Sequence, residues 1–141
     1  MERIVVAAKA GSDQPWLAEA AAELASQTGG AHVDVVSADG LDIEAFSTIP
    51  RSELQEATRQ AAEGLAERLR GLGVDASAHA VQGPVVRSVL LFAEDVDADV
   101  IVCGASRRAG LAQRLLGTVP IELIQRARRP VLVITPPGGR S

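Results

Sequence analysis

The sequence has few aromatic residues and a single cysteine, and both shortages restrict what the protein can do. Only 2% of its 141 residues are aromatic, so a stack of rings that binds single-stranded nucleic acid has almost nothing to be built from. The lone cysteine, Cys103, has no partner for an intramolecular disulfide, which suits a reducing compartment. Its apolar neighbours favour a place in the core.

The sequence also has no excess of basic residues and no long apolar run. Fourteen Lys and Arg against eighteen Asp and Glu give a net charge of −4, so the general positive field that attracts a phosphate backbone is absent. No apolar run approaches the roughly twenty residues of a membrane span, and no leader pattern follows Met1. We therefore expect a cytoplasmic protein with neither nucleic acid nor membrane as a partner. The basic segment Arg126 to Arg129 fits the end of a helix, where cations complement the helix dipole.

What the sequence does contain is a regular alternation of strand and helix signals. Short β-branched runs without polar alternation are typical of strands buried on both faces, and segments of helical periodicity separate them. The order β-α-β-α-β-α-β-α-β predicts an α/β domain over residues 1–136, an open, mostly parallel five-stranded sheet with helices on both faces, followed by a frayed tail at 137–141. The predicted strands are 3–8, 32–37, 74–81, 99–104 and 130–135, and the helices begin near residues 13, 52, 84 and 118.

Two of these helix starts carry capping signals. Gly11-Ser12-Asp13 before Pro15 predicts a turn and an N-cap, with the proline in the first helical turn. Ser52 and Gln55 have the spacing of a capping box for the second helix.

Ligands of such sheets bind beyond the carboxyl ends of the strands, where the strand order reverses. This rule directs attention to two loops, Lys9 to Asp13 and Gly104 to Thr118. The sequence has no G-x-S-x-G elbow, no G-x-x-x-x-G-K-[ST] loop and no G-x-G-x-x-G after the first strand. His32 and His79 fall in separate predicted strands without the spacing of metal ligands, so both are interpreted as structural. We predict no metal, no catalytic residue and no enzymatic turnover.

The chain resembles the universal stress protein family of the UspA type over nearly its whole length. Ala98 to Ile134 (A-D-V-I-V-C-G-A-S-R-R-A-G-L-A-Q-R-L-L-G-T-V-P-I-E-L-I-Q-R-A-R-R-P-V-L-V-I) is similar to the C-terminal half of that family. Upstream, Q-G-P-V-V-R-S-V-L-L-F-A is similar to the family's Gly-x-Pro helix start and I-V-V-A-A-K-A-G-S-D to its first strand and turn, with residues 38–60 the least diagnostic. The resemblance implies the adenine nucleotide alpha hydrolase-like fold.

The members of this family that bind ATP carry G-x-x-G-(nine residues)-G-[ST] after the fourth strand. Glycines there let backbone N–H groups approach the phosphates, and a hydroxyl at a helix N-terminus adds a donor. Carried across, Gly104, Gly117 and Thr118 match this motif, whereas Arg107 stands in place of the second glycine. Gly110 is a further candidate of the same crevice, or only a loop glycine.

The first loop departs from the family as well. Nucleotide-binding members have a carboxylate after the first strand that accepts hydrogen bonds from ribose, but Lys9 stands here, and a cation accepts none. Asp13 would have to replace that carboxylate. The cations of the two loops, Lys9, Arg107, Arg108 and Arg114, predict instead a compact pocket for a small phosphate or carboxylate ligand.

A structural interpretation remains open at each of these positions. Gly104 then only permits a turn, Thr118 only caps a helix, and Lys9 and Arg107 are solvated or pair with Asp13.

From these residues we predict a non-catalytic stress-response or regulatory protein with a degenerate nucleotide site and unknown protein partners. The alternative is a genuine ATP- or AMP-binding member that uses Gly104, Gly117 and Thr118, with or without slow ATPase activity. ATP is the one candidate cofactor. The resemblance further implies a homodimer formed through the last strand, Val131 to Ile134, at a sheet edge.

Overall fold

The computed structural model describes residues 1–11, 13–40, 50–105 and 118–137. Within these residues the predicted alternation is confirmed, and the ends of the elements differ from the prediction by at most two residues. The strands are β1 (Arg3–Ala7), β2 (His32–Ala38), β3 (Ala76–Val81), β4 (Val100–Gly104) and β5 (Val131–Ile134). The helices are α1 (Pro15–Gln27), α2 (Arg51–Gly71), α3 (Val85–Asp95) and α4 (Thr118–Arg126).

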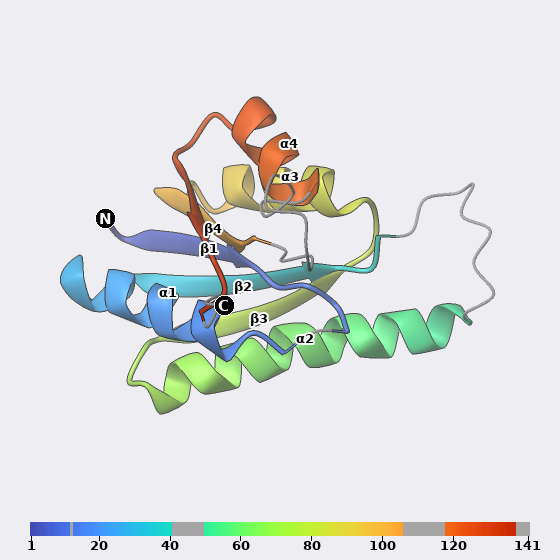
Figure 1. Cartoon of the computed structure of the whole chain (residues 1–141), viewed down its shortest axis with the longest axis horizontal. Coiled ribbons are helices and arrows are strands. Elements are labelled where there is room, and N and C mark those ends of the chain that lie inside the picture. Colours follow the sequence, from blue (N-terminus) through green and yellow to red (C-terminus); the bar gives the residue numbers. More distant parts are fainter. Residues whose placement is uncertain (12, 41–49, 106–117, 138–141) are drawn as a thin grey trace.

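The strands form one parallel five-stranded sheet in the order β3-β2-β1-β4-β5 (Figure 1). The chain builds the sheet outward from β1 to β3 and then crosses to β4 on the other side of β1. The strand order therefore reverses between β1 and β4, which places the ligand-binding position of this architecture at their carboxyl ends. The last strand, β5, lies at an edge of the sheet, as expected.

Helices α1 and α2 cover one face of the sheet, and α3 and α4 cover the other (Figure 1). Successive residues of β1 point into different cores: Val6 packs with α1 and α2, and Val5 packs with α3 and α4. Both are fully buried. Burial on both sides explains why this strand is a continuous apolar run instead of an alternating one. None of the described helices is both long and apolar enough to cross a membrane.

Both capping predictions are wrong. Gln14, not Ser12 or Asp13, precedes the first residue of α1, and its side chain makes no cap hydrogen bond. Helix α2 begins at Arg51, so Ser52 already lies inside it, and Pro50 takes the N-cap position. Proline at that position fixes an extended backbone before the helix, and this restriction replaces the side-chain cap.

One carboxylate is buried within the sheet. Asp34 of β2 is 2% exposed and accepts hydrogen bonds from Arg3 Nη2 at 2.7 Å and His79 Nε2 at 3.0 Å. His32 Nε2 lies 3.3 Å from the same carboxylate, and His32 Nδ1 lies 2.8 Å from Asp75. The two histidines do lie in separate strands, but they share one partner. Among the described residues, no group of metal-ligating side chains is arranged to hold a metal ion.

Opposing effects act on the pKa of Asp34. Burial raises it, but the hydrogen bonds from Arg3 and His79, together with the charges of Arg3 and His32, outweigh burial and hold the pKa below 3.8. The folded state therefore binds this proton less readily than the unfolded chain. The resulting stabilisation is present above about pH 4 and is lost as the pH falls through the folded-state pKa.

We expect Asp34→Asn to lower the free energy of unfolding at pH 7 by about 1–3 kcal/mol, because Arg3 and both histidines lose a charged acceptor. The deficit should shrink at pH 3, where the wild-type carboxylate is losing its advantage. Urea unfolding at the two pH values measures both quantities. Asp75→Asn is the matched control, since that carboxylate is 82% exposed and its loss should change stability by less than about 0.5 kcal/mol. An equal deficit at both pH values would contradict this account.

Candidate functional site

The candidate site lies at the adjoining carboxyl ends of β1 and β4. These strands pair directly, with Val6 opposite Val102, so the segments that follow them begin side by side. After β1 the chain turns at Gly11, whose φ of +76° is strained for any residue with a side chain, and then enters α1. After β4 the described chain continues to Ala105, which hydrogen-bonds to Ile134 of β5 at 2.8 Å.

The structure places four of the predicted site residues. Lys9 and Asp13 are exposed in the β1–α1 loop, Gly104 is the last residue of β4, and Thr118 is the exposed first residue of α4. Thr118 lines a separate hollow of about 360 Å³ between the N-terminal turn of α3 and the length of α4. The other predicted residues lie outside the described part of the chain: Arg107, Arg108, Gly110, Arg114 and Gly117.

A residue that the sequence did not single out, Gln14, occupies the middle of the crevice. Only 9% of it is exposed. Its Oε1 accepts a hydrogen bond from the backbone N–H of Lys9 at 3.3 Å. Its Nε2 lies beside Gly104, 3.0 Å from the position that a Cβ atom would take there. The carboxamide therefore bridges the ends of β1 and β4.

Gly104 leaves room for a neighbouring side chain in this arrangement. A Cβ atom at this position would lie 2.5 Å from Cη2 and 3.1 Å from Cζ3 of Trp16, well inside van der Waals contact. The indole ring of Trp16, in α1, thus packs directly on the backbone of β4. Glycine is required here by that packing, whether or not the same backbone also approaches a ligand.

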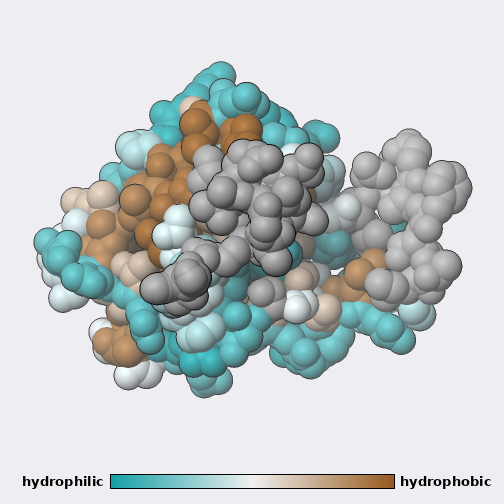
Figure 2. Space-filling model, viewed as in Figure 1, coloured by the Kyte–Doolittle hydropathy of each residue, from teal (hydrophilic) through white to brown (hydrophobic). Residues whose placement is uncertain are grey.

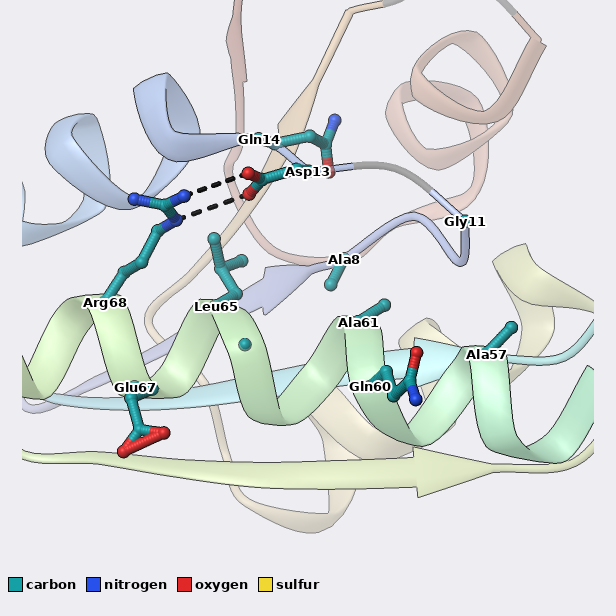
Figure 3. Close-up of a pocket in the computed structure, with 11 residues that line it drawn as sticks. Ala8, Gly11, Asp13, Gln14, Ala57, Gln60, Ala61, Leu65, Glu67 and Arg68 are labelled. Atoms are coloured by element: carbon teal, nitrogen blue, oxygen red, sulfur yellow. Dashed lines mark hydrogen bonds and ion pairs between the residues drawn. The ribbon is translucent and has the colours of Figure 1, made fainter.

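Asp13 is engaged away from β4. Arg68 of α2 donates to its carboxylate from Nη2 at 2.9 Å and from Nε at 3.3 Å, and Figure 3 shows the pair joining the β1–α1 loop to α2. Both side chains are about half or more exposed, so the pair contributes at most about 1 kcal/mol. It nevertheless orients the carboxylate that would have to replace the family's ribose acceptor.

A cavity of about 680 Å³ separates this loop from α2. Its floor consists of small or apolar residues, and its rim carries the Asp13–Arg68 pair, Gln60 and Glu67 (Figure 3). Small side chains on successive turns of α2 leave this space open, because none reaches the loop. The floor residues are Ala8, Ala57, Ala61, Gly64 and Leu65.

The one thiol near the crevice is not a nucleophile. Cys103 of β4 is 2% exposed, which confirms the predicted core position. Burial raises the pKa of its thiol to about 11, so almost no thiolate forms at neutral pH.

Comparison with known proteins shows to which family the chain is related. The family model described as the universal stress protein family matches residues 1–135. The chain belongs to the universal stress protein family. A curated relative, universal stress protein MJ0531 of Methanocaldococcus jannaschii, is 31% identical over 105 residues, which cover 74% of this chain. The matched part spans 62% of that relative's length.

Solved structures confirm the fold. A universal stress protein from Archaeoglobus fulgidus superposes with a TM-score of 0.75 at 24% identity, covering 95% of this chain and 98% of that one. A structure of the Archaeoglobus fulgidus protein in complex with dAMP gives a TM-score of 0.70 at 23% identity, with coverage of 95% and 98%. At this identity the likeness shows the shared α/β architecture of universal stress proteins.

Sequence reasoning missed the residues that fill the crevice. None of Gln14, Trp16 and Arg68 was among the predicted site residues. The available signal was weak: Trp16 is the only tryptophan and stands one turn after the expected ligand loop of this universal stress protein. Its contact with Gly104 depends on how α1 crosses β4, which local periodicity does not encode.

We expect Gly104→Ala to destabilise the protein by about 1–3 kcal/mol, because the added methyl overlaps the Trp16 indole. Trp16→Leu alone should also be destabilising, through lost contact area. In the double variant the Trp16→Leu change makes room for the added methyl group. The loss of stability of the double variant should therefore be smaller than the sum of the two single losses. Chemical denaturation of all four proteins gives this coupling, and strictly additive effects would rule out the contact as the cause.

Proposed function

We propose that this chain is a cytoplasmic, non-catalytic regulatory universal stress protein whose nucleotide site is degenerate. The observation that carries the proposal is the occupation of the crevice by the chain's own side chains. The Gln14 carboxamide and the Trp16 indole both lie against Gly104, the position that matches the first glycine of the ATP motif.

The polarity of the first loop supports the same proposal. A ribose hydroxyl donates its proton best to a carboxylate, and Lys9 presents an ammonium group in place of that acceptor. Arg68 binds both oxygens of Asp13 and holds this carboxylate toward α2, so a ribose hydroxyl could use only the lone pairs that the guanidinium leaves.

We expect the wild-type protein to bind Mg-ATP with a Kd weaker than about 10 µM in calorimetric titration, which corresponds to less than about 7 kcal/mol of binding free energy. Lys9→Asp, which restores a carboxylate after β1, should tighten binding by about tenfold, or about 1.4 kcal/mol. Arg51→Asp makes the same change of charge at an exposed position at the start of α2 and should leave the affinity unchanged. A wild-type Kd tighter than 10 µM would overturn the proposal.

The second candidate function is genuine binding of an adenine nucleotide. Two observations favour it: the Archaeoglobus fulgidus structure is a complex with dAMP, and the 680 Å³ cavity beside β1 lies within the size range of small-molecule sites. Mass spectrometry of the denatured protein distinguishes the two candidates, since a tight site carries its nucleotide through purification. A slow ATPase activity requires this second candidate to be correct.

We also propose that two copies of the chain pair through β5. Within the described sheet β5 pairs with β4 alone, and its Leu132 is 38% exposed. On the neighbouring helix, Ile121 and Ile124 are 43% and 51% exposed. Figure 2 shows apolar surface over the region of α4 and β5. An exposed apolar edge favours association, and a two-fold axis would cover both copies at once.

Light scattering at about 50 µM should give twice the mass of 14.7 kDa for the wild-type protein. Leu132→Asp should shift the mass toward that of one chain, because it places a charge in the apolar contact. Leu72→Asp is the matched control: that leucine is 52% exposed but follows α2, on the face that α4 does not cover. A wild-type mass of one chain would contradict the dimer.

A further inference from the structure

We propose that His32 is a protonation-dependent clasp, which makes the folded protein more stable at mildly acidic pH than above neutrality. His32 is the first residue of β2, and the clasp joins it to the segment that enters β3. These positions lie at the amino ends of the strands, whereas the crevice lies at their carboxyl ends. The inference therefore goes beyond the proposed function and does not depend on it.

Both ring nitrogens of His32 face carboxylate oxygens. Nδ1 lies 2.8 Å from Oδ2 of Asp75, and Nε2 lies 3.3 Å from Oδ1 of Asp34. An ionised carboxylate only accepts hydrogen bonds, and a neutral imidazole has a single N–H donor. Only the doubly protonated ring can therefore donate to both carboxylates at once.

A neutral His32 has a poorer arrangement in the same place. The hydroxyl oxygen of Ser77 lies 3.2 Å from Nε2, so a neutral ring could donate to Asp75 from Nδ1 and accept a hydrogen bond from Ser77 at Nε2. The lone pair of Nε2 would then face the Asp34 oxygen at 3.3 Å, with no proton between two acceptors. Ser77 thus makes the neutral ring possible, and Asp34 makes it unfavourable.

The balance of charge favours one added proton in this cluster. Asp34 and Asp75 supply two negative charges. Among the described residues, Arg3 is the one arginine or lysine that forms an ion pair with either of them, at 2.7 Å from Asp34. With a neutral His32 the cluster therefore holds one negative charge in excess, and a proton on this ring removes the excess.

Other charged groups around His32 do not reverse this preference. The carbonyl of Glu2 accepts a hydrogen bond from the backbone N–H of His32 at 2.9 Å, and Asp99 accepts one from the backbone N–H of Glu2 at 2.6 Å. Both side chains are carboxylates, which favour a cation. From α2, the exposed Arg70 opposes it, but its guanidinium donates to the carbonyl of Ala76 at 3.0 Å, and solvent screens its charge.

The second histidine of the cluster, His79, is the internal comparison. Its Nε2 lies 3.0 Å from the same oxygen of Asp34, and its ring packs against Phe92 of α3 with 4.5 Å between the centroids. One N–H satisfies this single carboxylate, so the neutral ring with its proton on Nε2 fits here. Within the described residues His79 forms an ion pair with no second carboxylate, so a further proton would lack a partner.

The direction of the pH effect follows from these contacts. The unfolded chain holds neither carboxylate beside His32, so the doubly protonated ring gains its partners only on folding. The stabilisation is therefore complete on the acid side of the imidazole titration, which falls between about pH 5 and 8, and is lost as the pH rises through that range. Despite burial, the hydrogen bonds from Arg3 and His79 hold the pKa of Asp34 below its usual value, so this acceptor stays charged at about pH 5.

Nitrogen-15 NMR of the full chain tests the protonation states directly, because His32 and His79 are its only histidines. We expect His32 to keep protons on both ring nitrogens at a pH where His79 is already neutral and protonated on Nε2. A titration from about pH 5 to 8 covers this range, and His79→Gln assigns the signals. The opposite order of deprotonation, or a neutral His32 throughout the range, would overturn the proposal.

Urea unfolding at about pH 6 and 8 measures the effect on stability. The ratio of the wild-type folding constant to that of His32→Gln should be about tenfold larger at the lower pH, which corresponds to about 1.4 kcal/mol. His79→Gln is the matched control, since it makes the same replacement beside the same carboxylate. Its ratio to the wild type should change by less than about twofold between the two pH values.

The outcomes of these experiments are distinct from those of the ATP titration. Equal pH dependence of His32→Gln and His79→Gln would overturn the clasp, since a general effect of removing an imidazole would then explain both. The NMR titration of the wild-type protein decides the matter even where His32→Gln does not fold. Neither experiment involves a nucleotide, so failure of the clasp leaves the proposed function standing, and tight ATP binding would leave the clasp standing.

Discussion

The placement of β1 between β2 and β4, buried on both faces, is the constraint on which the rest of the molecule depends. A strand with apolar side chains on both sides needs helices above and below it, and this requirement sends α1 and α2 to one face and α3 and α4 to the other. It also requires a second neighbouring strand on the side of β1 away from β2, and the chain supplies this neighbour by crossing from β3 to β4. The two ends that meet at β1 and β4 are thus a product of core packing.

The same packing then limits what the meeting point can bind. Helix α1 reaches the sheet immediately after the β1–α1 loop, and the Trp16 indole closes on the backbone of Gly104. Gln14, held by the Lys9 N–H, fills the space between the strand ends. The backbone of Gly104 is covered by the chain's own side chains, so a match to the glycine motif does not by itself report an available site.

The sequence predicted the fold well because the signals for it are local. Apolar runs such as 100–103 identify buried strands, and Gly and Pro punctuate the helices. The failures are of two kinds. The cap assignments at Ser12 and Ser52 failed because Gln14 and Pro50, neither with a side-chain cap hydrogen bond, precede the first helical residues. The Asp34 cluster and the Trp16–Gly104 contact were not predicted because their residues come from different strands and helices, and only the strand order brings them together.

Family membership leaves the ligand open for a related reason. In this chain the packing of Trp16 requires glycine at the end of β4, and burial on both faces requires apolar residues in β1. The choice of ligand depends instead on whether a few atoms at the strand ends donate or accept protons, which the core does not constrain. At those ends the Lys9 backbone donates to the Gln14 side chain, and the nearest carboxylate, Asp13, is bound by Arg68. Neither contact alters the strand order, so the fold alone does not decide which ligand the crevice accepts.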